Sequence, residues 1–137
     1  MTDHELVLKK IARIEACVSD LRKYARVENL ATDVRELRFE EHSLQIAIQA
    51  ALDIASHIVA DERLGEPATN RAMFASLVGA GWISSKQGDA LSKMAGFRNI
   101  LVHGYDDVRL EILEDVVRNR LGDLLTFCEA IRARLVE

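Results

Sequence analysis

Four polar side chains that could do chemistry together lie within residues 96–107, the stretch GFRNILVHGYDD: Arg98, Asn99, His103 and Tyr105. Histidine can take or give a proton near neutral pH. Arginine offers a fixed fork of donors to a phosphate whose negative charge grows in the transition state, and asparagine can orient either group. This set of side chains suits phosphodiester chemistry on RNA.

An ordinary helix end is the competing interpretation of the same stretch. Gly104 follows the apolar run, and a glycine just past a helix end can adopt the left-handed conformation. A histidine near that end, such as His103, interacts well with the negative end of the helix dipole, which also favours its charged form. On spacing alone, both interpretations stay open.

The chemistry proposed for this cluster needs no metal ion, because the ribose 2′-hydroxyl can itself be the nucleophile. His4, His42 and His57 are scattered, and the sequence contains no HExxH pattern or cluster of carboxylates. We interpret His57, four residues after Asp53, as part of an intrahelical pair or another satisfied polar contact. We therefore predict neither a metal site nor a cofactor.

Helices are the elements that must position these side chains. The chain has one proline and 5% aromatic residues, and its apolar residues recur at spacings of three and four rather than in strand-like alternation. Long stripes with short connections favour an all-α fold, an antiparallel helical bundle. Five helices are expected, at about Asp3–Glu28, Asp33–Arg63, Arg71 to Gly79 or Gly81, Ser84–Gly104 and Asp107–Leu135.

Capping boxes mark two of these helix starts. Asp33 with Glu36, and Ser84 with Gln87, have the spacing in which two side chains satisfy the free backbone N–H groups of a first turn. The segment LQIAIQAALDIASHIV within the second helix is apolar on nearly every side. We expect this helix to lie centrally, with neighbours on more than one face.

The size and composition of the chain suit one globular domain over residues 1–137, with 49% hydrophobic and 29% charged residues. We find no apolar run near the ~20 residues of a membrane-spanning helix and no secretory signal at the N-terminus. A cytoplasmic protein without a membrane partner is expected. Cys17 and Cys128 are isolated in apolar settings, which predicts reduced core residues.

The charge of the chain, formally −4, excludes a strongly basic, general binder of polyanions. Any contact with nucleic acid must be local. Two groups of cations are candidates: Arg22, Lys23 and Arg26, then Arg35 and Arg38. The simpler interpretation is a solvated helix face, on which four acidic residues balance these cations: Glu28, Glu36, Glu40 and Glu41.

The segment from Arg98 to Tyr105 matches the pattern R-x4-H-x-Y, and together with the order of the helices it resembles the HEPN superfamily, in particular HepT-like toxins. The likeness extends through RELRFEEHSLQIAIQAALDIASHIVA, the AGWIS turn and the final helix. It implies a HEPN-like bundle that forms a homodimer and acts as a toxin ribonuclease on RNA, tRNA among the candidates. It also implies that Arg98 and His103 form the catalytic pair, with Asn99 in support.

The resemblance also implies a partner. The antitoxin of HepT-like toxins is MntA, a minimal nucleotidyltransferase that transfers AMP onto the motif tyrosine, here Tyr105. An added nucleotide would block the phosphate site of the RNA. A homodimer also answers a geometric difficulty, because Arg98 and His103 lie about 140° apart on a straight helix. A two-fold axis can bring two such pairs together.

Two other classes of function remain. A DNA-binding regulator is one, because the segment FASLVGAGWISSKQGDALSKMAG has the pattern of helix, glycine turn and helix. However, Lys86 and Lys93 are the only cations of its second helix before Arg98. DNA is therefore a poor candidate partner. The stronger alternative is a non-catalytic HEPN-like module that binds a nucleotidyltransferase. A complete motif shows that catalysis is possible, but it does not show how fast the protein cleaves RNA.

Overall fold

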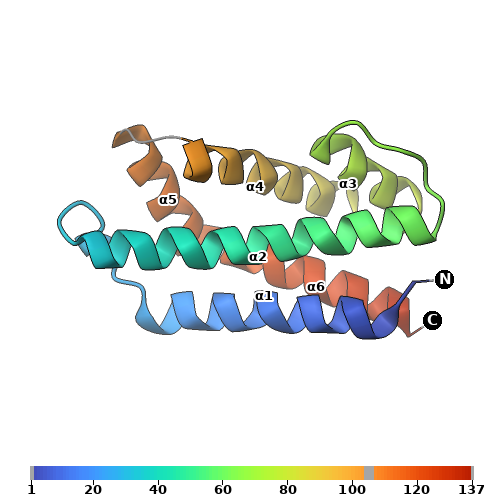
Figure 1. Cartoon of the computed structure of the whole chain (residues 1–137), viewed down its shortest axis with the longest axis horizontal. Helices are drawn as coiled ribbons and strands as arrows, with labels where there is room; N and C mark the ends of the chain where they lie inside the picture. Colours follow the sequence, from blue (N-terminus) through green and yellow to red (C-terminus); the bar gives the residue numbers. More distant parts are fainter. Residues whose placement is uncertain (1, 104–106, 137) are drawn as a thin grey trace.

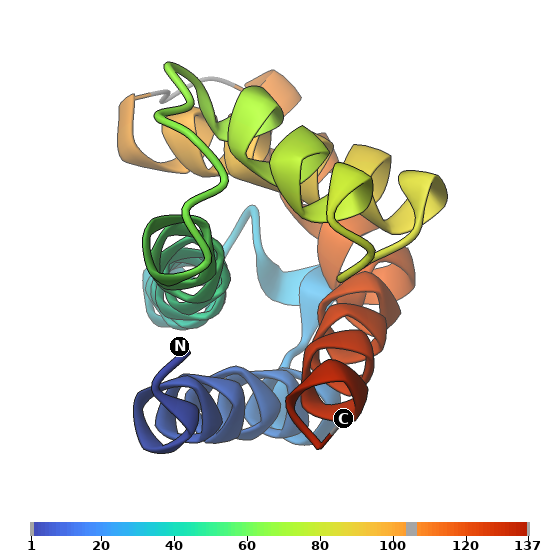
Figure 2. The same ribbon diagram turned by 90° about the vertical axis from the view of Figure 1, so that its right-hand side faces the viewer.

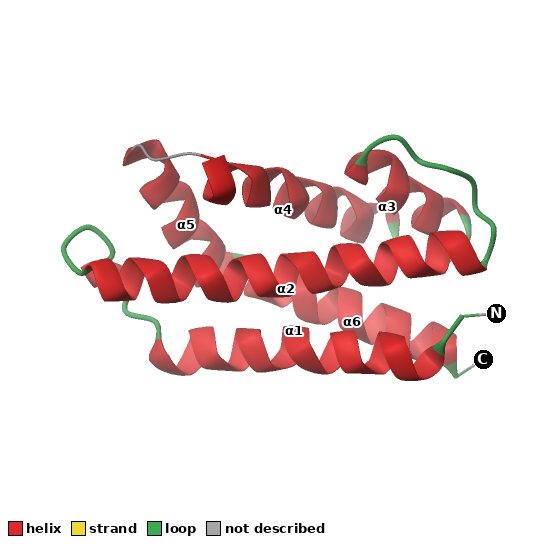
Figure 3. Ribbon diagram, in the orientation of Figure 1, coloured by secondary structure: helices red, strands yellow, loops and turns green. Residues whose placement is uncertain are grey.

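The computed structural model describes residues 2–103 and 107–136, with the side chains of 2–101 and 110–136. Within these residues the chain forms helices and loops and no strand (Figure 3). The all-α prediction is confirmed. The elements are α1 (His4–Tyr24), the short 3₁₀ helix η1 (Val27–Asn29), α2 (Val34–Asp61), α3 (Asn70–Gly79), α4 (Ser85–His103), α5 (Asp107–Asn119) and α6 (Leu121–Leu135).

Four of the helices, α1, α2, α4 and α6, form an antiparallel bundle (Figure 1). Each packs on the next, and α6 closes the ring against α1, as the view along the bundle shows (Figure 2). The helix α3 packs on α2 and α4, and α5 leads from the end of α4 back to α6. The end of α1, the beginning of α2 and the end of α4 therefore lie at the same end of the bundle.

The last predicted helix is two helices in the structure, so the number of α-helices described is six rather than five. The helix is interrupted at Arg120, a turn residue whose φ is −117° and ψ is −3°. This break lets Leu113 of α5 and Leu124 of α6, both fully buried, face the core from helices that run in different directions. The spacing of the apolar residues continues across Arg120, which is why the sequence did not reveal the break.

The start of α2 confirms one half of its predicted capping box. Asp33 Oδ1 accepts hydrogen bonds from the backbone N–H groups of Arg35 (2.9 Å) and Glu36 (3.4 Å). Glu36 does not return the bond, since the N–H of Asp33 donates to the carbonyl of Asn29 (2.9 Å). Glu36 Oε2 instead accepts from the N–H of Arg26, at 2.9 Å, and so fastens the connection from α1 to the first turn of α2.

Both ends of the α3–α4 connection follow the sequence prediction. Gly81 has a φ of +82°, the left-handed conformation that ends a helix, while the N–H of Trp82 donates to the carbonyl of Leu77 (2.9 Å). The capping box of α4 is confirmed, because the N–H of Ser84 donates to Gln87 Oε1 (2.8 Å) and the N–H of Gln87 donates to Ser84 Oγ (3.1 Å).

The helix α2 lies at the centre, as predicted, and packs on every other α-helix. Its length and composition are enough to cross a membrane, but 56% of its most apolar window is buried inside the fold, and a core helix of a globular protein passes the same test. Its buried face is mostly small and branched: Ala47, Ile48, Ala51, Ile54, Ala55 and Ile58.

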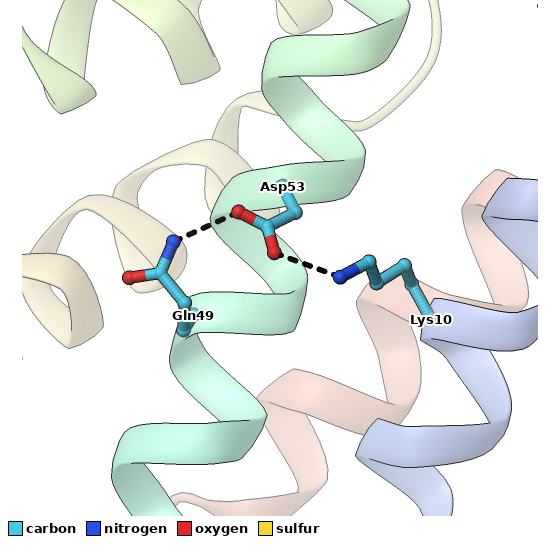
Figure 4. A network of polar contacts seen from close by, with 3 residues as sticks. All are labelled: Lys10, Gln49 and Asp53. Atoms are coloured by element: carbon cyan, nitrogen blue, oxygen red, sulfur yellow. Dashed lines mark hydrogen bonds and ion pairs between the residues drawn. The ribbon is translucent and has the colours of Figure 1, made fainter.

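Polar contacts cross-link α1 to its neighbours. Lys10 Nζ of α1 donates to Asp53 Oδ2 of α2 at 3.0 Å, and Gln49 Nε2 donates to Asp53 Oδ1 at 2.8 Å (Figure 4). Burial acts to raise the pKa of Asp53, but the hydrogen bonds from Gln49 and Lys10 and the charge of Lys10 outweigh it and lower the pKa. Arg132 of α6 binds both carboxylate oxygens of Glu15 of α1, at 3.0 and 3.1 Å. These contacts hold the bundle and show no arrangement suited to catalysis.

Candidate functional site

The final turns of α4 are anchored by their apolar side. Met94, Phe97 and Leu101 are 4%, 5% and 4% exposed and point into the core. This i, i+3, i+7 spacing occupies one side of the helix, and Asn99 and Ile100 lie outside it, exposed. The core thus determines which way the polar residues of the motif face.

Arg98 lies at the boundary between core and solvent. Its side chain is half-buried, and its Nε is buried without a hydrogen-bond partner among the described residues. A buried donor without an acceptor costs free energy, on the order of 1–3 kcal/mol. The next residue, Asn99, is exposed. The structure therefore places a half-buried guanidinium and an exposed amide on successive residues near the end of α4.

The sequence predicts that this helix ends at Gly104. The prediction is confirmed to within one residue, because α4 ends at His103. The side chain of His103 lies outside the described residues, and so do Gly104 and Tyr105 altogether. The pairing of Arg98 with His103 and the role of Tyr105 consequently stay predictions.

Two acidic residues of α2 that we placed on a solvated face are buried instead. Glu40 is 0% exposed and Glu41 is 5% exposed, so the prediction that both lie on a solvated face is wrong, although Glu41 does balance a cation, Arg38, at 3.2 Å. Burial raises the pKa of Glu40 to about 8, and the nearby carboxylates of Glu36, Glu28 and Glu114 add to the rise. The signal was present in the sequence, since both lie three or four residues before the buried Leu44.

A hollow of about 910 Å³ runs along α4 and faces α5 and α6. Met94, Phe97 and Val116 contribute apolar surface, while Lys93 and Asp115 contribute opposite charges. Among the described residues that line it there is no histidine or cysteine, so it offers no group whose ordinary pKa lies near neutrality. We therefore keep the candidate site at the end of α4.

Structural contacts account for His57 and the two cysteines, the other side chains considered as metal ligands or nucleophiles. His57 Nε2 lies 3.1 Å from Asp61 Oδ2 and 3.2 Å from the N–H of Asp3, so the predicted polar contact exists, although Asp53 is not its partner. Burial raises the pKa of both free cysteines, for Cys128 to about 12. In the described part of the chain, no group of three acidic, histidine or cysteine residues could hold a metal ion.

The helix pair α3–α4 does form a helix, turn and helix, but α4 is not free to enter a DNA groove. It packs against α2, α3, α5 and α6, and its residues Leu91 and Ala95 are buried as well as those named above. A recognition helix needs an exposed side rich in base-contacting residues. The DNA-binding interpretation therefore loses its structural basis.

Comparison with known proteins identifies relatives along almost the whole chain. Residues 8–131 match the family model described as Ribonuclease HepT-like. The mRNA nuclease HepT of Shewanella oneidensis is 32% identical over 131 residues, which cover 95% of this chain and 98% of the relative. The similarity thus includes the motif helix and all the helices around it.

Solved structures agree with the sequence comparison. A crystal structure of a toxin–antitoxin complex with AMP-PNP contains a chain that superposes with a TM-score of 0.88 at 31% identity, covering 95% of this chain and 99% of the other. The tri-AMPylated HEPN toxin of Shewanella oneidensis in complex with its MNT antitoxin gives a TM-score of 0.86 at 33% identity, covering 97% and 99%.

Proposed function

Because this chain belongs to the HepT-like ribonuclease family, we propose that it is the toxin of a toxin–antitoxin pair, an endoribonuclease silenced by a nucleotidyltransferase antitoxin. The observation that carries the proposal is the complete R-x4-H-x-Y motif at the end of α4, in a fold shared with toxins solved beside their antitoxins. The substrate would be RNA, with mRNA and tRNA as candidates.

The reaction we propose is an internal transfer at phosphorus. The ribose 2′-oxygen attacks the adjacent phosphorus, the bond from phosphorus to the 5′-oxygen breaks, and a 2′,3′-cyclic phosphate and a 5′-hydroxyl result. Arg98 stabilises the charge that grows on the phosphate oxygens through the donors of its guanidinium group. His103 gives a proton to the leaving 5′-oxygen, and Asn99 helps to orient the phosphate.

A homodimer completes this site in our proposal. Residues five apart on a straight helix point about 140° from each other, so Arg98 and His103 of one chain cannot readily approach one phosphate from the same side. A two-fold axis beside the ends of two α4 helices would bring together two arginines and two histidines. The second histidine could then take the proton of the attacking 2′-hydroxyl. Ile100, 39% exposed beside Asn99, offers apolar surface for such a contact.

Silencing would occur by transfer of AMP from ATP to the hydroxyl of Tyr105, with release of pyrophosphate. The tyrosine stands two residues after His103. A phosphodiester attached there adds a negative charge where RNA must place its own phosphate, and a nucleoside that fills the space around it. The similarity to a tri-AMPylated toxin supports this regulation. A cytoplasmic location stays a prediction.

Cleavage of single-stranded RNA by the purified protein in excess EDTA tests the proposed function. We expect 2′,3′-cyclic phosphate ends from the native protein and none from Arg98→Ala or His103→Ala proteins that melt at the native temperature. Cleavage that disappears in EDTA and returns with magnesium would overturn the metal-independent reaction. A native protein that binds its nucleotidyltransferase tightly but never cleaves RNA would favour the non-catalytic module.

A further inference from the structure

We propose that a cationic surface at the end of α1 and the start of α2, formed by Arg22, Lys23, Tyr24, Arg26 and Arg35, binds single-stranded RNA. The inference rests on the proposed ribonuclease function and adds where the substrate lies outside the reacting phosphate. It replaces our simpler interpretation of these cations as part of a balanced, solvated face.

An exposed aromatic ring stands among the cations of this surface. Tyr24 is 63% exposed although it is the last residue of α1, directly after Arg22 and Lys23 and two residues before Arg26. All three cations are exposed as well. A ring held in water between positive charges suits a flat, negatively charged partner, because bases stack on aromatic faces while phosphates pair with the cations.

The cations of this surface are not neutralised by ion pairs. Within the described chain, Arg22, Lys23 and Arg35 have no carboxylate within ion-pair distance, whereas Arg38 is paired with Glu41 at 3.2 Å. We exclude Arg38 from the surface for that reason. Since Glu40 and Glu41 are buried, neither of them faces the surface as a counter-charge.

Four acidic residues accompany these cations along the chain, Asp20, Glu28, Asp33 and Glu36, and the last two are directed at backbone donors. The carboxylate of Asp33 accepts from two N–H groups of the first turn of α2, and that of Glu36 accepts from the N–H of Arg26. Their charge is therefore partly offset by these donors and by the positive end of the α2 dipole. The four cations equal these carboxylates in number, but no ion pair joins them within the described residues, so the cations stay available to a phosphate backbone.

The segments that carry these residues are joined at one end of the bundle. The backbone N–H of Arg26 donates to Glu36 Oε2 at 2.9 Å, which ties the chain after α1 to the first turn of α2, where Arg35 lies. The end of α1 and the start of α2 lie at the end of the bundle where α4 terminates with His103 (Figure 1). A single strand crossing this surface could therefore continue to the motif.

RNA fits this surface better than a protein partner does. A protein interface generally has an apolar centre, whereas Tyr24 is surrounded by charged residues, and Val34, 67% exposed, is the other large apolar group nearby. Single strands bind such surfaces with little sequence preference, through phosphate contacts and stacking. Such contacts suit a nuclease that must hold RNA on either side of the cleaved bond.

The first arm of the test measures binding of a fluorescent, single-stranded oligoribonucleotide to proteins that also carry His103→Ala, so that the RNA is not cut. Arg22→Gln with Lys23→Gln should weaken binding about tenfold at moderate salt. It should also reduce the slope of log affinity against log salt by about 1.4, because about 0.7 is expected for each phosphate contact on a single strand. The matched control, Lys86→Gln with Lys93→Gln on α4, removes the same charge elsewhere.

The second arm separates stacking from charge. Tyr24→Leu should weaken RNA binding about tenfold while leaving the salt slope unchanged, since stacking on one base contributes roughly 1–3 kcal/mol. Tyr24→Phe should bind as the parent does. With His103 intact, the surface variants should raise KM for RNA and leave kcat near the native value. Melting temperatures should not change, because the replaced side chains are exposed.

Three outcomes would overturn the inference. Surface variants within twofold of the parent would remove the RNA contact, and an equal loss in the Lys86 and Lys93 control would reduce it to an effect of net charge. Unchanged RNA binding with loss of dimerisation or of antitoxin binding would make this a protein interface. In all three cases the native protein would still cleave RNA. If the proposed ribonuclease function is itself wrong, the native protein would not cleave RNA.

Discussion

Val78 of α3 packs directly over Gly88 of α4: a Cβ atom built on Gly88 would lie 2.7 Å from Val78 Cγ2. Carbon atoms do not approach so closely without displacement, so the crossing of these two helices depends on the absence of a side chain at Gly88. The contact sets the start of α4, and through the length of that helix it sets where Arg98 emerges.

Gly88→Ala should lower the free energy of unfolding by about 1–2 kcal/mol, because the cost of overpacking exceeds the gain in helix propensity. Gly96→Ala in the same helix is the matched control, since nothing lies within 4 Å of a Cβ there, and it should stabilise the protein by roughly 0.5–1 kcal/mol. Urea unfolding measures both. Two variants of equal stability would show that α3 shifts freely to make room.

Glu40→Gln should make the stability of the protein less dependent on pH. The folded pKa of Glu40, about 8, lies above the ordinary value of 4.5, so the stability that this group contributes is complete below pH 4.5 and is lost as pH rises towards 8. The loss is up to ~5 kcal/mol, at ~1.4 kcal/mol for each pH unit. Unfolding at pH 5 and pH 8.5 measures it, with the exposed Glu66→Gln as control. Parallel pH curves for native and Glu40→Gln proteins would refute the shift.

His103→Gln should retain the fold and lose about 10²- to 10⁴-fold in the rate of RNA cleavage, because glutamine can form hydrogen bonds but cannot exchange a proton near neutral pH. Single-turnover cleavage of a labelled RNA measures the rate, and the melting temperature controls for folding. An active His103→Gln protein would eliminate the acid–base role and leave Arg98 with positioning alone.

Tyr105→Phe should remain an active, toxic nuclease in the presence of the antitoxin and ATP, because it lacks the hydroxyl that accepts AMP. Mass spectrometry of the native pair should find AMP on the peptide that contains Tyr105, and RNase activity should fall in proportion. AMP mapped to Tyr24, or full neutralisation by an antitoxin unable to transfer AMP, would replace modification with occlusion as the mechanism.

The helices of the core could be predicted because each one carries its own periodic signal. Spacings of four and three predict one stripe from Val7 to Ala25, and its members within α1 are all buried: Val7, Ile11, Ile14, Val18 and Leu21. Ala25 lies just past the end of α1 and is half-buried. Ser84 and Gln87 cap α4 because both partners of that capping box lie within one turn. Information of this kind is local, so neither neighbouring helices nor their packing is needed to find it.

The sequence by itself determined the all-α fold, the starts of the α-helices except α6, and the motif residues with the family that they indicate. The tertiary structure decided which polar groups meet water. It buried Glu40 and left Tyr24 exposed, and it divided the last helix at Arg120. It also brought the cations of α1 and α2 to the end of the bundle where α4 ends. Periodicity shows that a residue faces some neighbouring helix. Only the packed helices show which helix that is, and which residues they leave exposed to solvent.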